Sequence, residues 1–260
     1  MKIVVCIKQV PETTEVKINP ETNTLVREGV QSIINPFDMY AIEEALRLKE
    51  RFGGETTAIS MGPPQAAEAL RQALSLGIDN AILVCDRAFA GSDTWATSFT
   101  LASAIKKSGF DIIICGKQAS DGDTAQVGPG ISAHLDIPQV TYVRKIESII
   151  NGQIKVERLM EEGFDIIESS LPVLITVVKE INEPRLASLK NMMRAKKAVI
   201  TQWTYKDLEL NEADIGLNGS PTKVVKIFTP PPKEKGKLLE GTTEEIVRNL
   251  VNSLKGDICG

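Results

Sequence analysis

Short apolar runs of strand length alternate with amphipathic stretches along the first half of the chain. The runs lie at residues 3–7, 56–61, 80–85 and 112–115. The first is apolar and β-branched throughout, which is typical of a strand buried on both faces of a parallel sheet. The stretches between the runs place apolar residues at helical spacing, from Asn35 to Gly53, over 66–76, and from about 93 to 107. This order predicts an α/β fold with a doubly wound, mostly parallel, Rossmann-like sheet.

Caps and breakers mark the ends of these predicted helices. Asn35 is the expected N-cap of the first, with Pro36 in its first turn and Asp38 favourable to the helix dipole. Gly77 is the expected C-cap of the second, and Ser92 or Asp93 is expected to cap the third.

The pattern changes after residue 135, where apolar and polar positions alternate. Residues 139–149 and 153–159 flank Asn151 and Gly152, which form a strong hairpin signal. Residues 164–168 and 173–177 are expected to continue this antiparallel pattern. A smaller hairpin is predicted near the N-terminus, with strands at 16–19 and 24–27.

The last part of the chain is basic and irregular. From Asn182 onward it contains the basic run 189–197, for which a solvated helix face is the usual interpretation. Residues 206–241 have turn composition and are expected to build little core, and an amphipathic helix is predicted over 243–254. We therefore expect an α/β domain over 1–195 and an extended arm over 196–260. A tail of this kind docks either on its own domain or on a partner.

The loop after the fourth apolar run is the main candidate for chemistry. The run ends at Gly116, and the spacing of Val127, Ile131 and Leu135 predicts a helix beyond the loop. A loop between a strand and a helix lies at the carboxyl end of the strand, where open α/β sheets bind ligands. Residues 121–124 offer several helix caps, and the backbone N–H groups of about 123–127 suit a phosphate.

An ordinary capped turn explains the same loop equally well from spacing alone. Asp121 and Asp123 would repel a pyrophosphate, so they fit better as helix caps or as acceptors for a ribose hydroxyl. Residues 128–133 also match the pattern G-x-G-x-x-A, but these glycines come too late after the strand for a dinucleotide fingerprint.

Composition limits the classes of function. A chain of 260 residues with 42% hydrophobic and 25% charged residues is typical of a globular protein, and a net charge of −4 gives no reason to expect nucleic acid. The four cysteines, which have no C-x-x-C spacing, are expected to be buried free thiols in a reducing compartment. His134 is the only histidine, so no metal site is expected and its role is expected to be structural. No signal peptide or membrane-spanning run is apparent, and we expect a cytoplasmic protein without membrane insertion.

Six short motifs, in the same order along the chain, resemble the beta (small) subunit of electron-transfer flavoproteins. They are residues 5–10 (VCIKQV), 35–38 (NPFD), 60–63 (SMGP), 116–119 (GKQA), 182–185 (NEPR) and 193–197 (MRAKK). The resemblance implies a nucleotide-binding α/β subunit paired with an alpha subunit that carries FAD. It also implies that the flavin does the chemistry, and we identify no catalytic general acid or base.

The resemblance further implies an adenine-nucleotide cleft built from four segments. Its expected lining residues are Cys6, Ile7, Lys8, Asn35, Pro36, Phe37, Asp38, Met61, Gly116, Lys117, Gln118, Ala119, Ser120, Asp121, Gly122, Asp123, Thr124, Ala125, Gln126 and Val127.

Two occupants of this cleft remain open. Common members of the family hold a structural AMP, whereas residues 121–129 look more like the electron-bifurcating branch, in which a second FAD accepts hydride from NADH. That branch implies ferredoxin or flavodoxin as a low-potential acceptor. Residues 187–193 lie where the family has a loop that docks on a partner flavin dehydrogenase, such as an acyl-CoA dehydrogenase, and Leu189 is the matching anchor. Its alternative is a leucine buried under the loop.

Two rival functions come from other classes. An ATP-using ligase or hydrolase would need a Ser-Gly-Gly type loop after the first strand, and residues 8–11 do not have that sequence. A nucleotide-sensing module without redox activity is the second rival, and a flavin spectrum of the purified complex would distinguish an electron carrier from it.

Overall fold

The computed structural model describes residues 1–12, 17–19, 24–26, 32–226, 236 and 238–258. The chain divides into two compact units, Met1–Val225 and Lys226–Gly260, and each is described by itself.

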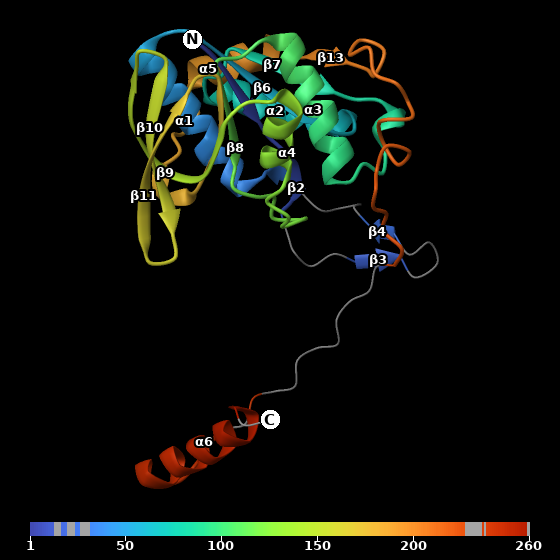
Figure 1. The fold of residues 1–260 in the computed structure, drawn as a ribbon. Helices are drawn as coiled ribbons and strands as arrows, with labels where there is room; N and C mark the ends of the chain where they lie inside the picture. The colour runs from blue at the N-terminus through green and yellow to red at the C-terminus, as the bar shows by residue number, and fades with distance from the viewer. Residues whose placement is uncertain (13–16, 20–23, 27–31, 227–235, 237, 259–260) are drawn as a thin grey trace. The chain divides into compact units, whose positions relative to one another are not determined.

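A nine-stranded sheet forms the centre of the first unit, with the strand order β11-β10-β9-β12-β8-β1-β6-β7-β13. Its four middle and neighbouring strands β8, β1, β6 and β7 are the predicted apolar runs, and they pair in parallel. The strands are β1 Lys2–Cys6, β6 Glu55–Met61, β7 Asn80–Val84, β8 Ile112–Gly116, β9 Gln139–Ile150, β10 Gln153–Met160, β11 Gly163–Ser170, β12 Val173–Val177 and β13 Thr201–Trp203. The predicted α/β class is confirmed, and the β10–β11 hairpin forms one edge of the sheet (Figure 1).

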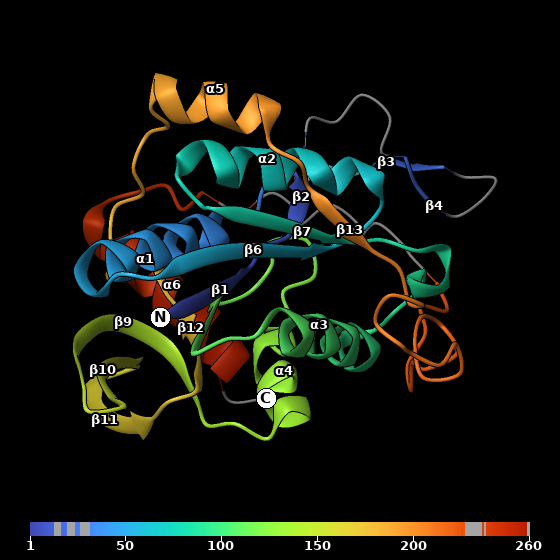
Figure 2. The same cartoon turned by 90° about the horizontal axis from the view of Figure 1, so that it is seen from above.

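Helices cover both faces of this sheet. One apolar cluster joins alternate strand residues to α1 (Pro36–Phe52), α2 (Ala67–Leu76) and α5 (Leu189–Lys197). A second cluster joins the other face to α3 (Thr94–Ser108) and α4 (Val127–Leu135). Figure 2 shows α2 and α5 on one side of the sheet and α3 and α4 on the other. This is the doubly wound arrangement that the alternation of strands and helices predicts.

Smaller elements complete the unit. Two short antiparallel pairs join β2 (Gln9–Pro11) to β5 (Ser32–Ile34), and β3 (Lys17–Asn19) to β4 (Thr24–Val26). The second pair confirms the N-terminal hairpin, whose turn lies outside the described residues. Three 3₁₀ turns occur at Pro64–Ala66, Arg87–Phe89 and Lys179–Ile181.

The predicted place of β12 is wrong. We expected it to continue the antiparallel meander, but it lies between β8 and β9 and pairs in parallel with both. All five of its residues are buried, since its sequence VLITV has no polar alternation. A strand with two apolar faces is stabilised most in the middle of a covered sheet.

The core also extends further along the chain than expected. β13 pairs in parallel with β7, and Leu208 and Ile215 are buried in the second apolar cluster. Leu208 and Ile215 therefore contribute to the core, and the first compact unit spans Met1–Val225.

The basic helix α5 is only partly a solvated face. Its lysines are exposed, but Ala195 is buried and the Arg194 guanidinium donates to the carbonyl oxygens of Leu74 and Ile78 at 3.1 and 2.7 Å. These carbonyls lie at the C-terminal end of α2, so Arg194 ties one helix to the other.

Two glycines of α4 permit close packing of this helix against its neighbours. A Cβ at Gly128 would lie 2.9 Å from Cγ2 of Thr176 in β12. A Cβ at Gly130 would lie 2.5 Å from Oγ and 2.7 Å from Cβ of Ser98 in α3. The G-x-G-x-x-A match at 128–133 is therefore a packing feature.

We expect Gly130→Ala to lower the free energy of unfolding by about 1–3 kcal/mol, because the added methyl group overpacks the α3–α4 contact. Urea denaturation measures the change. Ser98→Gly in the same chain should restore part of the loss, since it removes the atoms in the way. A Gly130→Ala protein as stable as the wild type would show that the helices separate without cost.

Candidate functional site

The expected site residues gather at the carboxyl edge of the parallel sheet. Cys6, Met61 and Gly116 end the neighbouring strands β1, β6 and β8. The loop 117–126 leaves β8 and leads into α4. Its first residue is fixed to the sheet, because the Lys117 N–H donates to the Val177 carbonyl oxygen at 2.9 Å.

Asn35 links the start of α1 to this loop. We expected its side chain to cap α1, but it makes no cap hydrogen bond. Its Nδ2 donates instead to Oδ1 of Asp38 at 2.9 Å and to the Gln118 carbonyl oxygen at 2.8 Å. Its Oδ1 accepts from the Ser120 N–H at 3.1 Å. Asn35 is only 1% exposed, so a buried amide holds two segments together that are far apart in sequence.

Asp38 is the second buried polar residue at this edge. Its carboxylate accepts from the Lys8 N–H at 2.7 Å, from Asn35, and from the backbone N–H of Gly116. Burial raises the pKa of this carboxyl from 3.8 to about 7, although these hydrogen bonds act in the opposite direction. Gly116 is required here, since a Cβ would overlap Asp38 and lie 2.8 Å from the Phe37 carbonyl carbon.

The two acids of the loop are already paired within the protein. The Lys8 ammonium lies 2.7 Å from Oδ1 of Asp121, and the Gln118 side-chain amide donates to Asp123. The prediction that residues 121–124 cap the next helix is wrong. α4 begins at Val127, and its N-cap Gln126 makes no side-chain cap bond.

A backbone feature explains why the helix starts late. Asp123 and Ala125 have φ values of 52° and 53°, in the left-handed region where helices do not continue. The Asp123 N–H donates to the Ala119 carbonyl oxygen at 2.8 Å, which closes a tight turn before α4. Such strain is costly in residues other than glycine and is common at binding sites.

The start of α4 is consequently suited to an anion. In the first turn of α4, Val127 and Gly128 have N–H groups without a carbonyl partner within the helix, whereas Pro129 has no N–H group. These two N–H groups lie at the positive end of the helix dipole. Gly122 faces open space, because a Cβ placed there would meet no atom within 4 Å. Lys8 neutralises Asp121, whereas Asp123 keeps its charge because its partner Gln118 is neutral, so the site offers donors and room for a phosphate beside one remaining carboxylate.

The remaining expected residues divide between lining and core. Lys117, Phe37 and Met61 are half-buried, and Pro36 and Thr124 are exposed. The side chain of Ile7 is buried in the first apolar cluster, so it supports the site from below.

Among the described residues, Cys6 and Cys115 are buried, whereas Cys85 and His134 are half-buried. Cys6 and Cys115 are neighbours in register on β1 and β8 and are free thiols. Cys259 lies outside the described residues. His134 packs edge-on against Trp95 and Phe99, with ring centroids 4.6 and 5.4 Å apart, as the structural interpretation predicted.

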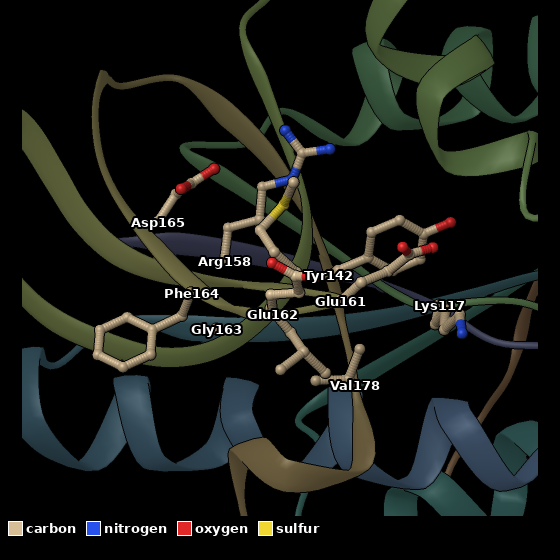
Figure 3. A pocket seen from close by; sticks show the side chains of 11 residues that line it. Lys117, Tyr142, Arg158, Glu161, Glu162, Gly163, Phe164, Asp165 and Val178 are labelled. Carbon is tan, nitrogen blue, oxygen red and sulfur yellow. The ribbon is translucent and has the colours of Figure 1, made fainter.

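A groove that the sequence did not indicate adjoins the loop at Lys117. It has a volume of about 720 Å³ and is lined by β9, by the β10–β11 hairpin and by Val178 (Figure 3). Tyr142 lines it with φ of 58°, an unusual value for an aromatic residue, and the Lys117 ammonium lies 5.1 Å from the centre of its ring. Acidic and basic side chains both line the groove, so its charge favours no single class of ligand.

Leu189 lies at the first position of α5 and is 75% exposed. The alternative that this leucine is buried under its loop is therefore wrong. Leu186, which the sequence analysis did not single out, is 93% exposed nearby in the chain.

Comparison with known proteins identifies close relatives. The sequence model described as the electron transfer flavoprotein domain matches residues 22–208. An "Electron transfer flavoprotein subunit beta" of Thermoanaerobacterium thermosaccharolyticum is 54% identical over 98% of both chains. The "Caffeyl-CoA reductase-Etf complex subunit CarD" of Acetobacterium woodii is 50% identical over 98% of both. "Protein FixA" of Sinorhizobium fredii is 47% identical, over 98% of this chain and 92% of its own.

Membrane-spanning helices were also sought. None of the helices in the described ranges is both long and apolar enough to cross a bilayer.

The raised pKa of Asp38 predicts a pH dependence of stability. Between about pH 4 and pH 7 the folded protein keeps a proton on Asp38 that the unfolded chain has lost, so the free energy of unfolding falls as the pH rises. Asp38→Asn cannot titrate. Relative to this variant, the wild type should lose stability by a few kcal/mol from pH 4 to pH 8, at about 1.4 kcal/mol per pKa unit. Urea denaturation of both proteins across this range checks it, and parallel profiles would contradict it.

Proposed function

We propose that this chain, which belongs to the beta-subunit family of electron transfer flavoproteins, binds FAD at the carboxyl edge of its sheet. We further propose that it takes part in electron bifurcation. In this proposal the subunit accepts hydride from NADH. Electrons then pass to the FAD of an alpha subunit and to a low-potential acceptor such as ferredoxin or flavodoxin. The alternative is a non-bifurcating subunit that holds a structural AMP.

The observation that carries the proposal is the uncapped start of α4 beside an open glycine. The N–H groups of Val127 and Gly128 would hold a phosphate, and Gly122 leaves room for it. Lys8 neutralises Asp121, which removes the repulsion that this acid would exert. Gln118 is uncharged, so it orients the carboxylate of Asp123 without cancelling its charge. The residues present therefore fit a nucleotide phosphate.

The protein residues act by binding and orienting. Asn35 and Asp38 keep the loop 117–126 against the strand ends, so the phosphate donors are in place before a ligand arrives. A bound FAD would supply hydride acceptance and the transfer of single electrons. The AMP moiety is common to both ligands, and this loop accommodates it in either case.

The preference for FAD comes from the loop sequence. Residues 121–129 resemble the bifurcating branch of the family. The open space at Gly122 leaves room for a ligand larger than AMP, which supports FAD. The ATP-using rival is disfavoured, because the residues after β1 form β2 and pair with β5 instead of making a phosphate loop.

The second unit supports an alpha-subunit partner, which a beta subunit of this family implies. Its helix α6 (Thr243–Ile258) carries an apolar stripe at helical spacing, formed by Val247, Leu250, Val251 and Leu254. These side chains are 43–54% exposed. We propose that this stripe docks on the alpha subunit, in a cytoplasmic heterodimer.

A further partner is proposed at α5. Leu189 would anchor a flavin dehydrogenase that acts on a CoA ester, and its 75% exposure supports this role. The printed name of the relative CarD places that protein in a complex of caffeyl-CoA reductase with Etf, which supports a partner of the same class here.

Flavin counting tests the main proposal. We expect two FAD per heterodimer and prompt bleaching by NADH. Gly122→Val should lower the nucleotide content severalfold without unfolding the chain, because the valine meets only the ligand. Asp123→Ala should also lower the nucleotide content. Asp123→Asn should leave the nucleotide content nearly unchanged, because asparagine keeps an acceptor for Gln118 and tolerates the left-handed backbone. One FAD with one AMP and no reaction with NADH would establish the alternative.

Removal of residues 233–260 tests the heterodimer. The truncated subunit should no longer co-purify with the alpha subunit, because the stripe of α6 is lost. Leu250→Asp in the full chain should weaken the complex in the same way, and the neighbouring Asn249→Asp, outside the apolar stripe, serves as the control. Co-purification of the truncated chain at full stoichiometry would show that the main contact lies elsewhere.

A further inference from the structure

The segment between Ile181 and α5 is fastened to α1 by two side chains. Asn182 Nδ2 donates to the Tyr40 carbonyl oxygen and to Oε2 of Glu44, both at 3.0 Å. Arg185 binds Glu43 and Glu50, which also belong to α1. The segment has no regular structure of its own over residues 182–188, so these bonds determine its course.

Arg185 makes the larger part of this attachment. Its Nε and one terminal nitrogen donate to the two oxygens of Glu43 at 2.7 and 3.1 Å. Its terminal nitrogens donate to Glu50 at 2.5 and 3.1 Å. Its backbone N–H also donates to Glu43 at 3.1 Å. A planar guanidinium that pairs with two carboxylates in this way admits essentially one orientation.

The Glu43 end of this clamp is buried. The Glu43 side chain is 5% exposed, against 60% for Glu50. Burial by itself would raise the pKa of Glu43, but hydrogen bonds from Arg185 and Arg47 outweigh it and hold the pKa below its ordinary value. The charged pair is therefore a fixed point of the structure, since removal of one partner would leave a buried charge.

The clamp adjoins the most exposed leucines in this part of the chain. Leu186 follows Arg185 directly and is 93% exposed, and Leu189 is 75% exposed. Beyond them, Arg194 fastens α5 to the end of α2, and Arg71 donates to the Ala195 carbonyl oxygen at 2.5 Å. Two leucines are thus presented to solvent on a backbone that is held on both sides.

A rigid presentation of this kind matters for association. An apolar anchor on an ordered segment loses less conformational entropy on binding than one on a loose loop. Within the folded subunit, these two exposed leucines bury little apolar surface and so contribute little to stability. Their exposure on an ordered segment is therefore consistent with a role in binding a partner.

We propose that Arg185 is a positioning residue for the docking of a flavin dehydrogenase that acts on CoA esters, through its hold on the segment that presents Leu186 and Leu189. This inference rests on the docking role proposed for Leu189. Arg185 itself need not touch the partner.

A double-mutant cycle in the assembled heterodimer tests the inference. Arg185→Lys keeps the charge next to Glu43 but cannot pair with both carboxylates at once. Arg47→Lys is the matched control, because Arg47 donates to the same Glu43 carboxylate at 2.9 Å from within α1. Glu50→Gln removes one arm of the clamp at an exposed position and provides a second, milder variant. The probe is a purified acyl-CoA dehydrogenase, reduced by its acyl-CoA, for which the wild-type heterodimer shows saturable electron transfer.

We expect Arg185→Lys to raise the KM of the heterodimer for this dehydrogenase roughly fivefold to tenfold, with kcat nearly unchanged. Flavin content should also stay unchanged. Hydrogen exchange should increase over residues 182–189 only. Arg47→Lys should change neither the KM nor the hydrogen exchange. In a Leu189→Ala background the Arg185 substitution should have little further effect, because the anchor that it positions is gone.

Two results would overturn the inference, and they are distinguishable. If Leu189→Ala alone leaves KM unchanged, the docking role of Leu189 fails and the positioning role of Arg185 fails with it. If Leu189→Ala raises KM but the effects of the two substitutions multiply, docking at Leu189 stands and Arg185 acts independently of it. An Arg185→Lys protein that behaves like Arg47→Lys would also refute the positioning role.

Discussion

The arrangement of the candidate site depends on how one buried carboxylate is satisfied. Asp38 has little access to water, so its oxygens must find donors inside the protein. They find them on Lys8 just after β1, on Gly116 at the end of β8 and on Asn35. These bonds draw two strand ends and the start of α1 to one point, which only a glycine at position 116 permits. Asn35 then extends the same network to Gln118 and Ser120. The loop that precedes α4 is therefore held from behind, and its outer side stays free for a ligand.

Much of the fold could be predicted from the sequence, because a strand that is buried on both faces of the sheet has a continuous apolar sequence. The apolar runs of β1 and β8 and the breakers Gly53 and Gly77 placed the central strands and helices correctly. The position of β12 was missed because strand order is a long-range property. Its apolar run is compatible with any strand position that is covered on both faces. Which strand pairs with β8 depends on packing between distant parts of the chain.

The gathering of the expected residues at one edge of the sheet was predicted, but the hydrogen bonds between them were not. The strand-to-helix junction after Gly116 was visible in the spacing of apolar residues. The role of Asn35 was not, because its partner Gln118 is 83 residues away and a cap is what asparagine usually provides before a proline. The left-handed turn at Asp123 and Ala125 was equally hidden, since alanine rarely adopts such φ values. The spacing of Val127 and Ile131 placed α4 correctly, but the acids before it suggested caps that the turn prevents.

α1 is the element that the two candidate surfaces share. Its first turn carries Asp38 at the nucleotide edge, and its later turns carry Glu43 and Glu50, which hold the docking segment. A helix packed along its length against a buried sheet moves as one body, because its apolar face has few alternative arrangements. Both the loop 117–126 and the segment 182–188 are therefore attached to the same rigid helix by side-chain hydrogen bonds. If the two proposed roles hold, α1 is the element that connects the candidate nucleotide edge with the candidate docking segment.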